Sequence, residues 1–213
     1  MFDTTKLKYI FFDMGYTLAD EGKAWERRCE EQAQTAQAQA LGMTAEDIYN
    51  EVAAASRAYL PMYRTVVEKF HFSEVAPYRR EFEFLYEDAA YVLEHLAAHY
   101  KLGIIANQSA GLAKRLESYG IRQYFDVVVS SWEHQCMKPD QRLFEIALQE
   151  AGCAASQAVM VGDRLDNDIY PAKALGMGTI WVRQGFGAMQ KPRSAAYEAD
   201  YVAESLGGVL EIL

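Results

Sequence analysis

The chain has 213 residues, of which 51% are hydrophobic and 24% charged, and its formal net charge is −9. This composition is typical of a globular protein, and the acidic balance argues against a broad nucleic-acid-binding face. No apolar run approaches the roughly 20 residues needed to span a bilayer, and the first residues lack the apolar region of a signal peptide. The three cysteines form neither a CxxC nor a zinc pattern. We therefore expect a soluble cytoplasmic protein that binds neither nucleic acid nor membrane.

The first predicted element is a short buried strand at 9–12 that ends at an acidic residue. The run from Tyr9 to Phe12 is wholly apolar and rich in aromatic side chains, as in strands covered on both faces. Asp13 and a turn-forming Gly15 follow directly. In open α/β sheets ligands bind at the carboxyl ends of the strands. The alternative for Asp13 alone is a residue that only initiates a turn.

Residues 20–84 form a block of different character, in which we predict helices and no strand before residue 84. Thr44 and Asp47 have the spacing of a capping box at the start of one of these helices. The predicted helices cover 26–40, 45–59 and 61–70, and a fourth begins at Pro77. Apolar side chains at helical spacing are expected to form the core of a small bundle: Tyr59, Met62, Tyr63, Phe70, Phe72, Phe82 and Phe84.

From residue 88 onward, predicted helices and strands alternate. Such alternation predicts βαβ units, and hence a parallel sheet with helices on both faces. The helical block at 20–84 is then an insertion after the first strand. The predicted strands cover 102–106, 125–130, 158–162, 179–182 and a short stretch at 201–203. The predicted helices cover 88–100, 111–119, 139–151 and 167–175.

Polar residues follow four of the predicted strands, so they are expected to meet at one edge of the sheet. Asp13 follows the first strand, the stretch 107–109 the second, Lys138 the third and Asp163 the fourth. Two neighbouring carboxylates repel each other unless a cation lies between them. A site with few, hard oxygen ligands suits Mg²⁺, which keeps water ligands and binds substrate phosphate. Lys138 would add a fixed positive charge for a phosphoryl group or for the nucleophile.

These motifs resemble those of the haloacid dehalogenase-like (HAD) hydrolase superfamily, in the branch with a helical cap inserted after the first motif. The resemblance covers nearly the whole chain, although the cap matches only in position and helical character. It implies a Rossmann-like core domain at 1–19 and 85–213 and an all-helical cap domain at 20–84. It also implies that Asp13 is the nucleophile, which forms an aspartyl-phosphate, and that Lys138 is the catalytic lysine of the family.

The same resemblance implies a set of metal ligands. Mg²⁺ would be held by Asp13, by the backbone carbonyl of Gly15 and by Asp163. Asp168 would bind the metal through water or would orient Lys138, and the neighbouring Asn167 competes with it for this role. The family's sheet order places the first and fourth strands side by side.

Two positions depart from the family pattern. Gly15 stands where the phosphatases usually carry a second Asp as general acid and base, and Ala106 stands where a phosphoryl-binding Ser or Thr is expected. A positioned acid–base group contributes about 10²–10⁴-fold to a rate. We therefore expect slow turnover and accumulation of phosphoenzyme, unless a cap residue or the candidate substrate-binding residues Asn107, Gln108 and Ser109 compensate. Turnover of an acyl phosphate would be slowed least, because its leaving group needs no proton.

We expect a Mg²⁺-dependent phosphatase of a small phosphorylated metabolite. One alternative is a HAD-like hydrolase of a carbon–halogen or carbon–phosphorus bond. The dehalogenases of the family use the same Asp without a metal, so the pair Asp163 and Asp168 argues against that variant. The other alternative is a non-catalytic binding or regulatory protein on the same scaffold, which Gly15 and Ala106 favour.

Overall fold

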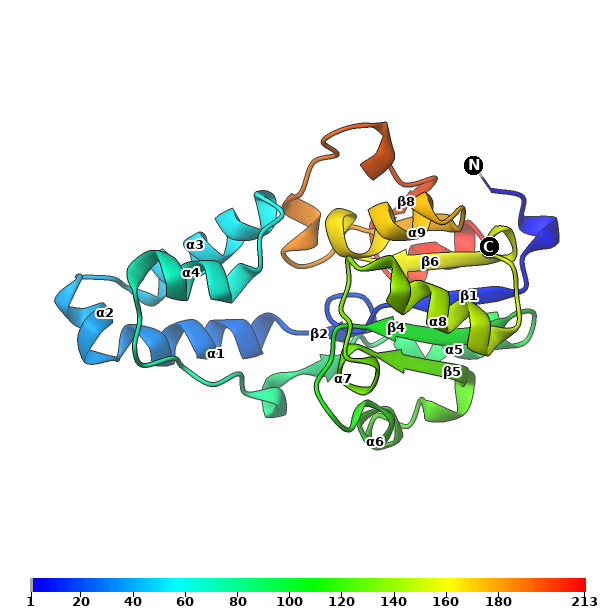
Figure 1. Ribbon diagram of the computed structural model, residues 1–213. Coiled ribbons are helices and arrows are strands. Elements are labelled where there is room, and N and C mark those ends of the chain that lie inside the picture. The colour runs from blue at the N-terminus through cyan, green and yellow to red at the C-terminus, as the bar shows by residue number, and fades with distance from the viewer. Residues whose placement is uncertain (1) are drawn as a thin grey trace.

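The computed structural model describes residues 2–213 and contains a six-stranded parallel sheet of order β5-β4-β1-β6-β7-β8 (Figure 1). β1 lies between β4 and β6, which confirms the prediction that the first and fourth predicted strands are neighbours. The carboxyl ends of the central strands therefore meet at one edge. The strands are β1 (Tyr9–Phe12), β4 (Lys101–Ala106), β5 (Phe125–Ser130), β6 (Ala158–Gly162), β7 (Gly178–Val182) and β8 (Tyr201–Ala203).

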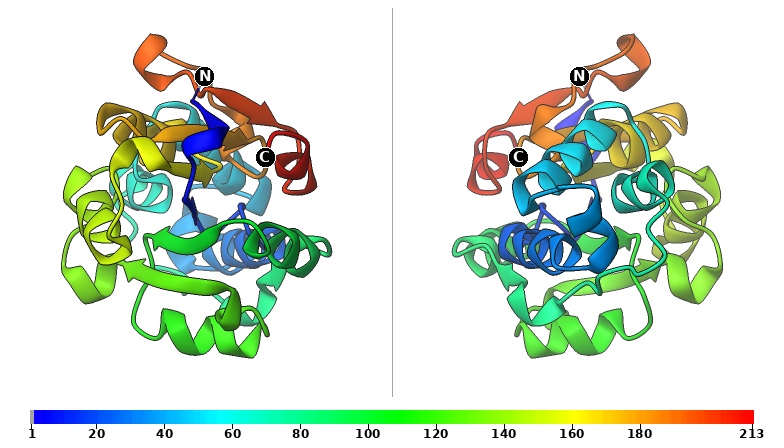
Figure 2. Two further views of the ribbon diagram at one scale, coloured as in Figure 1. Left: turned by 90° about the vertical axis from the view of Figure 1, so that its right-hand side faces the viewer. Right: turned by 90° about the vertical axis from the view of Figure 1, so that its left-hand side faces the viewer.

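Helices cover both faces of this sheet, as the views in Figure 2 show. Along β1 the side chains alternate between the faces. Ile10 and Phe12 pack in the cluster that includes α5 and α6, whereas Tyr9 and Phe11 pack in the cluster that includes α8 and α9. The predicted α/β class is thus confirmed. The helices of this part are α5 (Ala89–Ala97), α6 (Leu112–Ser118), α7 (Ser131–His134), α8 (Gln141–Ala151) and α9 (Tyr170–Ala174).

Four helices form a separate lobe beyond the carboxyl ends of the strands (Figure 1). The chain enters and leaves this helical lobe through a small antiparallel sheet of β2 (Ala19–Asp20) and β3 (Phe84–Leu85). The sequence did not predict these strands, because two-residue strands carry no periodic pattern. The helices of the lobe are α1 (Gly22–Ala33), α2 (Ala36–Ala40), α3 (Ala45–Arg57) and α4 (Met62–Phe70).

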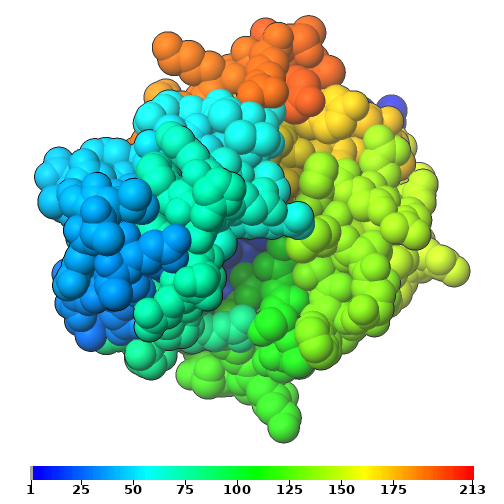
Figure 3. Space-filling view, turned by 60° about the vertical axis from the view of Figure 1, so that its left-hand side comes forward, coloured from blue at the N-terminus to red at the C-terminus, as the bar shows by residue number. Residues whose placement is uncertain are grey.

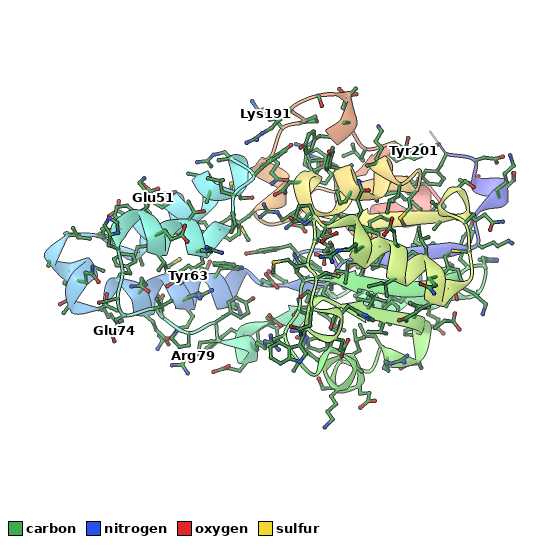
Figure 4. The ribbon with its side chains drawn as sticks, viewed as in Figure 1. Glu51, Tyr63, Glu74, Arg79, Lys191 and Tyr201 are labelled. Atoms are coloured by element: carbon green, nitrogen blue, oxygen red, sulfur yellow. The ribbon has the colours of Figure 1, made fainter. Side chains whose placement is uncertain are left out.

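The core of the helical lobe is aromatic. Tyr63 lies between α1 and α4 (Figure 4), where its hydroxyl donates to Gln32 Oε1 at 2.7 Å and its ring stacks under the Arg28 guanidinium. The expected core is confirmed for Tyr63 and Phe72, which are buried. It is wrong for Phe82 and Phe84, which are 36% and 52% exposed because they lie in the segment that leads back to the sheet.

Two predicted helices of the lobe differ from the structure. The predicted helix at 26–40 is divided into α1 and α2. Thr35 lies between them and caps α2, because its side chain accepts from the Ala38 N–H. No helix begins at Pro77. The chain before it is held instead by side chains of α1, since the Ala76 N–H donates to Gln32 Oε1 and the Ala76 carbonyl accepts from Arg28.

The loop after β7 joins the helical lobe to the sheet through hydrogen bonds and ring contacts. Ser56 Oγ donates to the Phe186 carbonyl at 3.1 Å, and Gln190 Nε2 donates to the Ser56 carbonyl at 2.9 Å. The buried Phe186 ring packs edge-on against Trp25 of α1 and against Tyr16. Within residues 2–213, no helix combines the length and the apolar character required to cross a membrane.

Candidate active site

The predicted catalytic pair lies together at the carboxyl edge of the sheet. Asp13 follows β1, and its backbone N–H donates to the Val161 carbonyl of β6, which fixes the start of the turn. Lys138 Nζ lies 2.6 Å from Asp13 Oδ1 and 2.5 Å from Asp168 Oδ1. The lysine is buried, and although burial acts against it, the charges of Asp13 and Asp168 raise the pKa of Lys138. Its ammonium is therefore a fixed cation between two carboxylates.

The backbone of Lys138 is positioned by a residue that the sequence assigned to substrate binding. Asn107 Oδ1 accepts from the Lys138 N–H at 2.8 Å, and Asn107 Nδ2 donates to the Lys138 carbonyl at 3.0 Å. Both polar atoms of the Asn107 amide are thus used to hold the loop that carries the lysine. Asn107 also lines the cavities described below.

Asp168 comes from a π-helical turn, Leu165–Ile169, that follows β6. Its Oδ2 accepts from the Arg164 N–H at 2.9 Å, while its Oδ1 accepts from Lys138, so both oxygens are engaged. A Cβ on Gly162 would lie 2.5 Å from this carboxylate, so only glycine leaves room for it. Of the two candidates at this spacing, Asp168 therefore joins the carboxylate cluster, whereas Asn167 lines the cavities beside it.

Asp163 completes a cluster of three carboxylates. One oxygen each of Asp13, Asp163 and Asp168 lie within 4.8 Å of one another. Burial, and then the charge of Asp168, raise the pKa of Asp163 well above its ordinary value. Burial likewise raises the pKa of Asp168 to about 6 against the opposing effect of Lys138. Three crowded carboxylates beside one lysine are an oxygen-rich donor set with excess negative charge, which fits a hard divalent cation.

The cluster opens into two adjoining cavities between the helical lobe and the sheet. The smaller, of about 120 Å³, is lined by Asp13, Gly15, Lys138 and the other carboxylates of the cluster. The larger, of about 530 Å³, lies beside it, and Figure 3 shows the hollow between the lobe and the sheet domain. Residues that line both cavities join the two spaces: Met62, Asn107, Lys138, Arg164 and Asn167.

The other predicted substrate-binding residues are placed differently. Gln108 lines the smaller cavity, and its backbone N–H donates to Ser131 Oγ. Ser109 is exposed outside both cavities, where its hydroxyl accepts from Arg80. Ala106 is fully buried at the end of β4, so this position offers no side-chain donor.

One acidic residue of the site was missed by the sequence analysis. Glu21 lies directly before α1 and lines the smaller cavity. Trp25 Nε1 donates to Glu21 Oε2 at 3.2 Å, and Glu21 Oε1 lies 2.3 Å from where a Cβ on Gly15 would stand. Burial, and then the charge of Glu83, raise the pKa of Glu21 to about 8. The signal in the sequence was the spacing of Glu21 and Trp25, which places both on one face of a helix start.

Comparisons with known proteins found similar sequences and similar structures. The family model described as haloacid dehalogenase-like hydrolase matches residues 10–182. The chain is 38% identical to the pyrimidine 5'-nucleotidase YjjG of Escherichia coli over 96 residues, which are 44% of this chain and 43% of that protein. It spans about half the length of the first curated relatives it matches, at 43% and 53%.

Two further similarities extend over almost the whole chain. The chain is 27% identical to the glyceraldehyde 3-phosphate phosphatase of Pyrococcus furiosus, over 98% of this chain and 93% of that protein. The crystal structure of YfnB from Bacillus subtilis bound to magnesium superposes with a TM-score of 0.71 at 21% identity, covering 97% of this chain and 98% of that one. The latter similarity shows the shared fold.

Proposed function

The chain belongs to the haloacid dehalogenase-like hydrolase family, and from this premise we propose that it is a Mg²⁺-dependent phosphatase of a small phosphorylated metabolite. The observation that carries the proposal is the contact of Lys138 Nζ with both Asp13 and Asp168 beside the carboxylate of Asp163. The names of the relatives support the same reaction class, since YjjG is a nucleotidase and the Pyrococcus furiosus protein a phosphatase.

In the proposed reaction, Asp13 attacks phosphorus and forms an aspartyl-phosphate that water then hydrolyses. Lys138 holds the Asp13 carboxylate in position and offers its charge to the phosphoryl oxygens. Asp13, Asp163, Asp168 and the Gly15 carbonyl would hold Mg²⁺, with Asp168 acting mainly by orienting Lys138, because both of its oxygens are already engaged. When bound there, Mg²⁺ would neutralise phosphoryl charge and screen the carboxylates from one another.

We further propose that residues 20–84 act as a cap domain over a core domain at 1–19 and 85–213. The small sheet of β2 and β3 joins the two parts, which supports hinges near Asp20 and Phe84. The larger cavity lies where the leaving group of a substrate bound at Asp13 would extend. The cap contributes Tyr59 and Met62 to its lining, and the core contributes Arg164. The cap therefore selects the substrate.

Hydrolysis of a panel of phosphoesters and acyl phosphates, with Mg²⁺ and with EDTA, tests the proposal. We expect turnover that EDTA abolishes and Mg²⁺ restores. Asp13→Asn should lower kcat/KM by on the order of 10³-fold or more, because a catalytic unit fails when its nucleophile is lost. The exposed Asp126→Asn is the matched control and should retain activity. Full activity of Asp13→Asn would rule out Asp13 as the nucleophile, whereas no turnover of any substrate by the wild type would point instead to a binding protein.

A further inference from the structure

We infer that Glu21 supplies the acid–base carboxyl that position 15 lacks, which makes it a catalytic residue of the reaction proposed above, on which this inference rests. Gly15, two residues after the nucleophile, removes the expected proton donor from the sequence. In the folded protein the Glu21 carboxyl lies where a side chain at position 15 would begin. The slow turnover expected from Gly15 alone is then no longer expected.

The position of Glu21 is defined by the missing side chain of Gly15. A Cβ on residue 15 would lie 2.3 Å from Glu21 Oε1 and 2.6 Å from Glu21 Cδ. Real Cβ atoms do not approach other atoms so closely. The Glu21 carboxyl therefore fills the space in which a side chain at position 15 would begin, and it can do so only because residue 15 is glycine.

The Glu21 carboxyl is also held in a defined orientation. Trp25 Nε1 donates to Oε2, so this oxygen is turned toward α1, and Oε1 is the oxygen nearer to the Cβ position of residue 15, at 2.3 Å against 3.0 Å. The Trp25 indole is itself buried and packs against the rings of Tyr63, Tyr78 and Phe186. A rigid indole thus fixes the carboxyl at the wall of the cavity that contains Asp13.

Glu21 is partly buried, and no structural ion pair accounts for its position. The neighbouring Glu83 is paired with Arg115, whose Nη1 lies 3.4 Å from Glu83 Oε2. In the described part of the chain, no lysine or arginine forms an ion pair with Glu21. Glu21 therefore serves no ion pair of the fold, and its carboxyl lines the cavity that contains Asp13.

The chemistry requires one proton to move in each step. In the first step Asp13 Oδ bonds to phosphorus, the bond from phosphorus to the leaving oxygen breaks, and protonated Glu21 gives its proton to that oxygen. In the second step water bonds to phosphorus, the bond from phosphorus to Asp13 breaks, and the Glu21 carboxylate takes a proton from the water. The sum is ester plus water giving alcohol plus inorganic phosphate, and Glu21 is protonated again.

The first experiment compares Glu21→Gln with wild type on two substrates that differ in leaving group. For an alkyl phosphate chosen from the panel, kcat/KM should fall by about 10²–10⁴-fold, because the leaving alkoxide needs a proton. For 4-nitrophenyl phosphate, kcat/KM should fall by less than about 10-fold, because its leaving group departs without one. Acid quench during turnover of this aryl ester should trap covalent phosphate on Asp13, since the second step lacks its base.

The matched control is Glu26→Gln, which makes the same change on the exposed face of α1. It should leave both values of kcat/KM unchanged, and its melting temperature shows what the exchange alone does to folding. A role of Glu21 in structure only would lower kcat/KM for both esters by the same factor. Equal losses, or no loss for the alkyl ester, would overturn the inference.

A rescue experiment keeps the inference testable if Glu21→Gln folds poorly. Glu21→Ala empties the space beside residue 15, and the double variant Gly15→Asp/Glu21→Ala then places a carboxyl there from the other side. We expect the double variant to exceed Glu21→Ala by at least about 10-fold in kcat/KM for the alkyl ester. A double variant no better than Glu21→Ala contradicts the inference. An inactive wild type would remove both proposals, whereas an inactive Asp13→Asn with unaffected Glu21 variants would remove only this one.

Discussion

At the scale of single residues, Lys138 determines the geometry of the active site. Its ammonium group contacts both Asp13 and Asp168, and Asn107 holds its backbone from the neighbouring strand end. A buried charge of this kind is tolerated only when its partners remain in place. The lysine is therefore as important for stability as for the proposed reaction.

Replacing Lys138 by Met should lower the free energy of unfolding by about 3–5 kcal/mol, because it leaves the buried Asp168 and the partly buried Asp13 without their cation. Phosphatase activity should be lost in the same variant. Urea denaturation and the panel assay measure the two effects. Lys114→Met, on the exposed surface of α6, is the control and should change neither. A stable Lys138→Met variant would mean that the charge of this lysine does not stabilise the two carboxylates.

The residues of the site could be predicted from sequence to different degrees. Asp13, Lys138 and Asp163 follow strands, and the rule that parallel strands end at one edge is enough to bring them together. Glu21 was not predicted as a site residue. Its approach to Gly15 depends on the path of the chain through β2, and no periodic sequence pattern predicts that path.

At the scale of elements, the helix start at Thr44 shows how local signals fix α3. The Thr44 hydroxyl accepts from the Asp47 N–H, and the Asp47 carboxylate accepts from the Thr44 N–H. This capping box was predicted from the sequence and is confirmed by the structure. It satisfies two backbone groups that otherwise lack partners at a helix start.

Thr44→Ala should lower the free energy of unfolding by about 1 kcal/mol, because α3 loses the side chain that caps it. Thermal and urea unfolding measure the change. Thr65→Ala, within α4, exchanges the same residue types without loss of a cap and should have little effect. If both variants lost the same stability, the cap would not be the cause.

The elements that sequence could not predict are those held by distant side chains. The segments α1 and α2 were predicted as one helix, since the alanines and glutamines there favour helix, and the cap that Thr35 forms for α2 was not recognised among them. The stretch after Ala76 was predicted as helical on the strength of Pro77. The backbone of Ala76, directly before this stretch, is instead hydrogen-bonded to Gln32 and Arg28 of α1, and these partners are in reach only in the assembled lobe.

At the scale of the whole molecule, the helical lobe and the sheet meet around Phe186. This residue follows β7, is 1% exposed, and places its ring among Trp25 and Tyr49 of the lobe and Tyr16 of the turn after Asp13. Ser56 bonds to its carbonyl. The Phe186 side chain therefore contacts both the lobe and the turn after Asp13.

Phe186→Ala should lower the free energy of unfolding by about 3–5 kcal/mol, because a large buried ring is replaced by a cavity. Amide hydrogen exchange should accelerate in α1 and α3 more than in β1 and β4, since the lobe loses its anchor. Met189→Ala, a truncation at a 41% exposed position in the same loop, is the control. Uniform acceleration throughout the chain would show that Phe186 does not join the two parts selectively.

The close approach of Glu21 to residue 15 also restricts how this protein could change during evolution. An Asp introduced at Gly15 alone would force the Glu21 carboxyl to move, and loss of Glu21 alone would remove the carboxyl that lies beside residue 15. The effect of a substitution at either position should therefore depend on the residue at the other, so the two positions are expected to be epistatic. A lineage with glycine here would tend to keep glutamate at position 21, and the two residues should vary together among descendants.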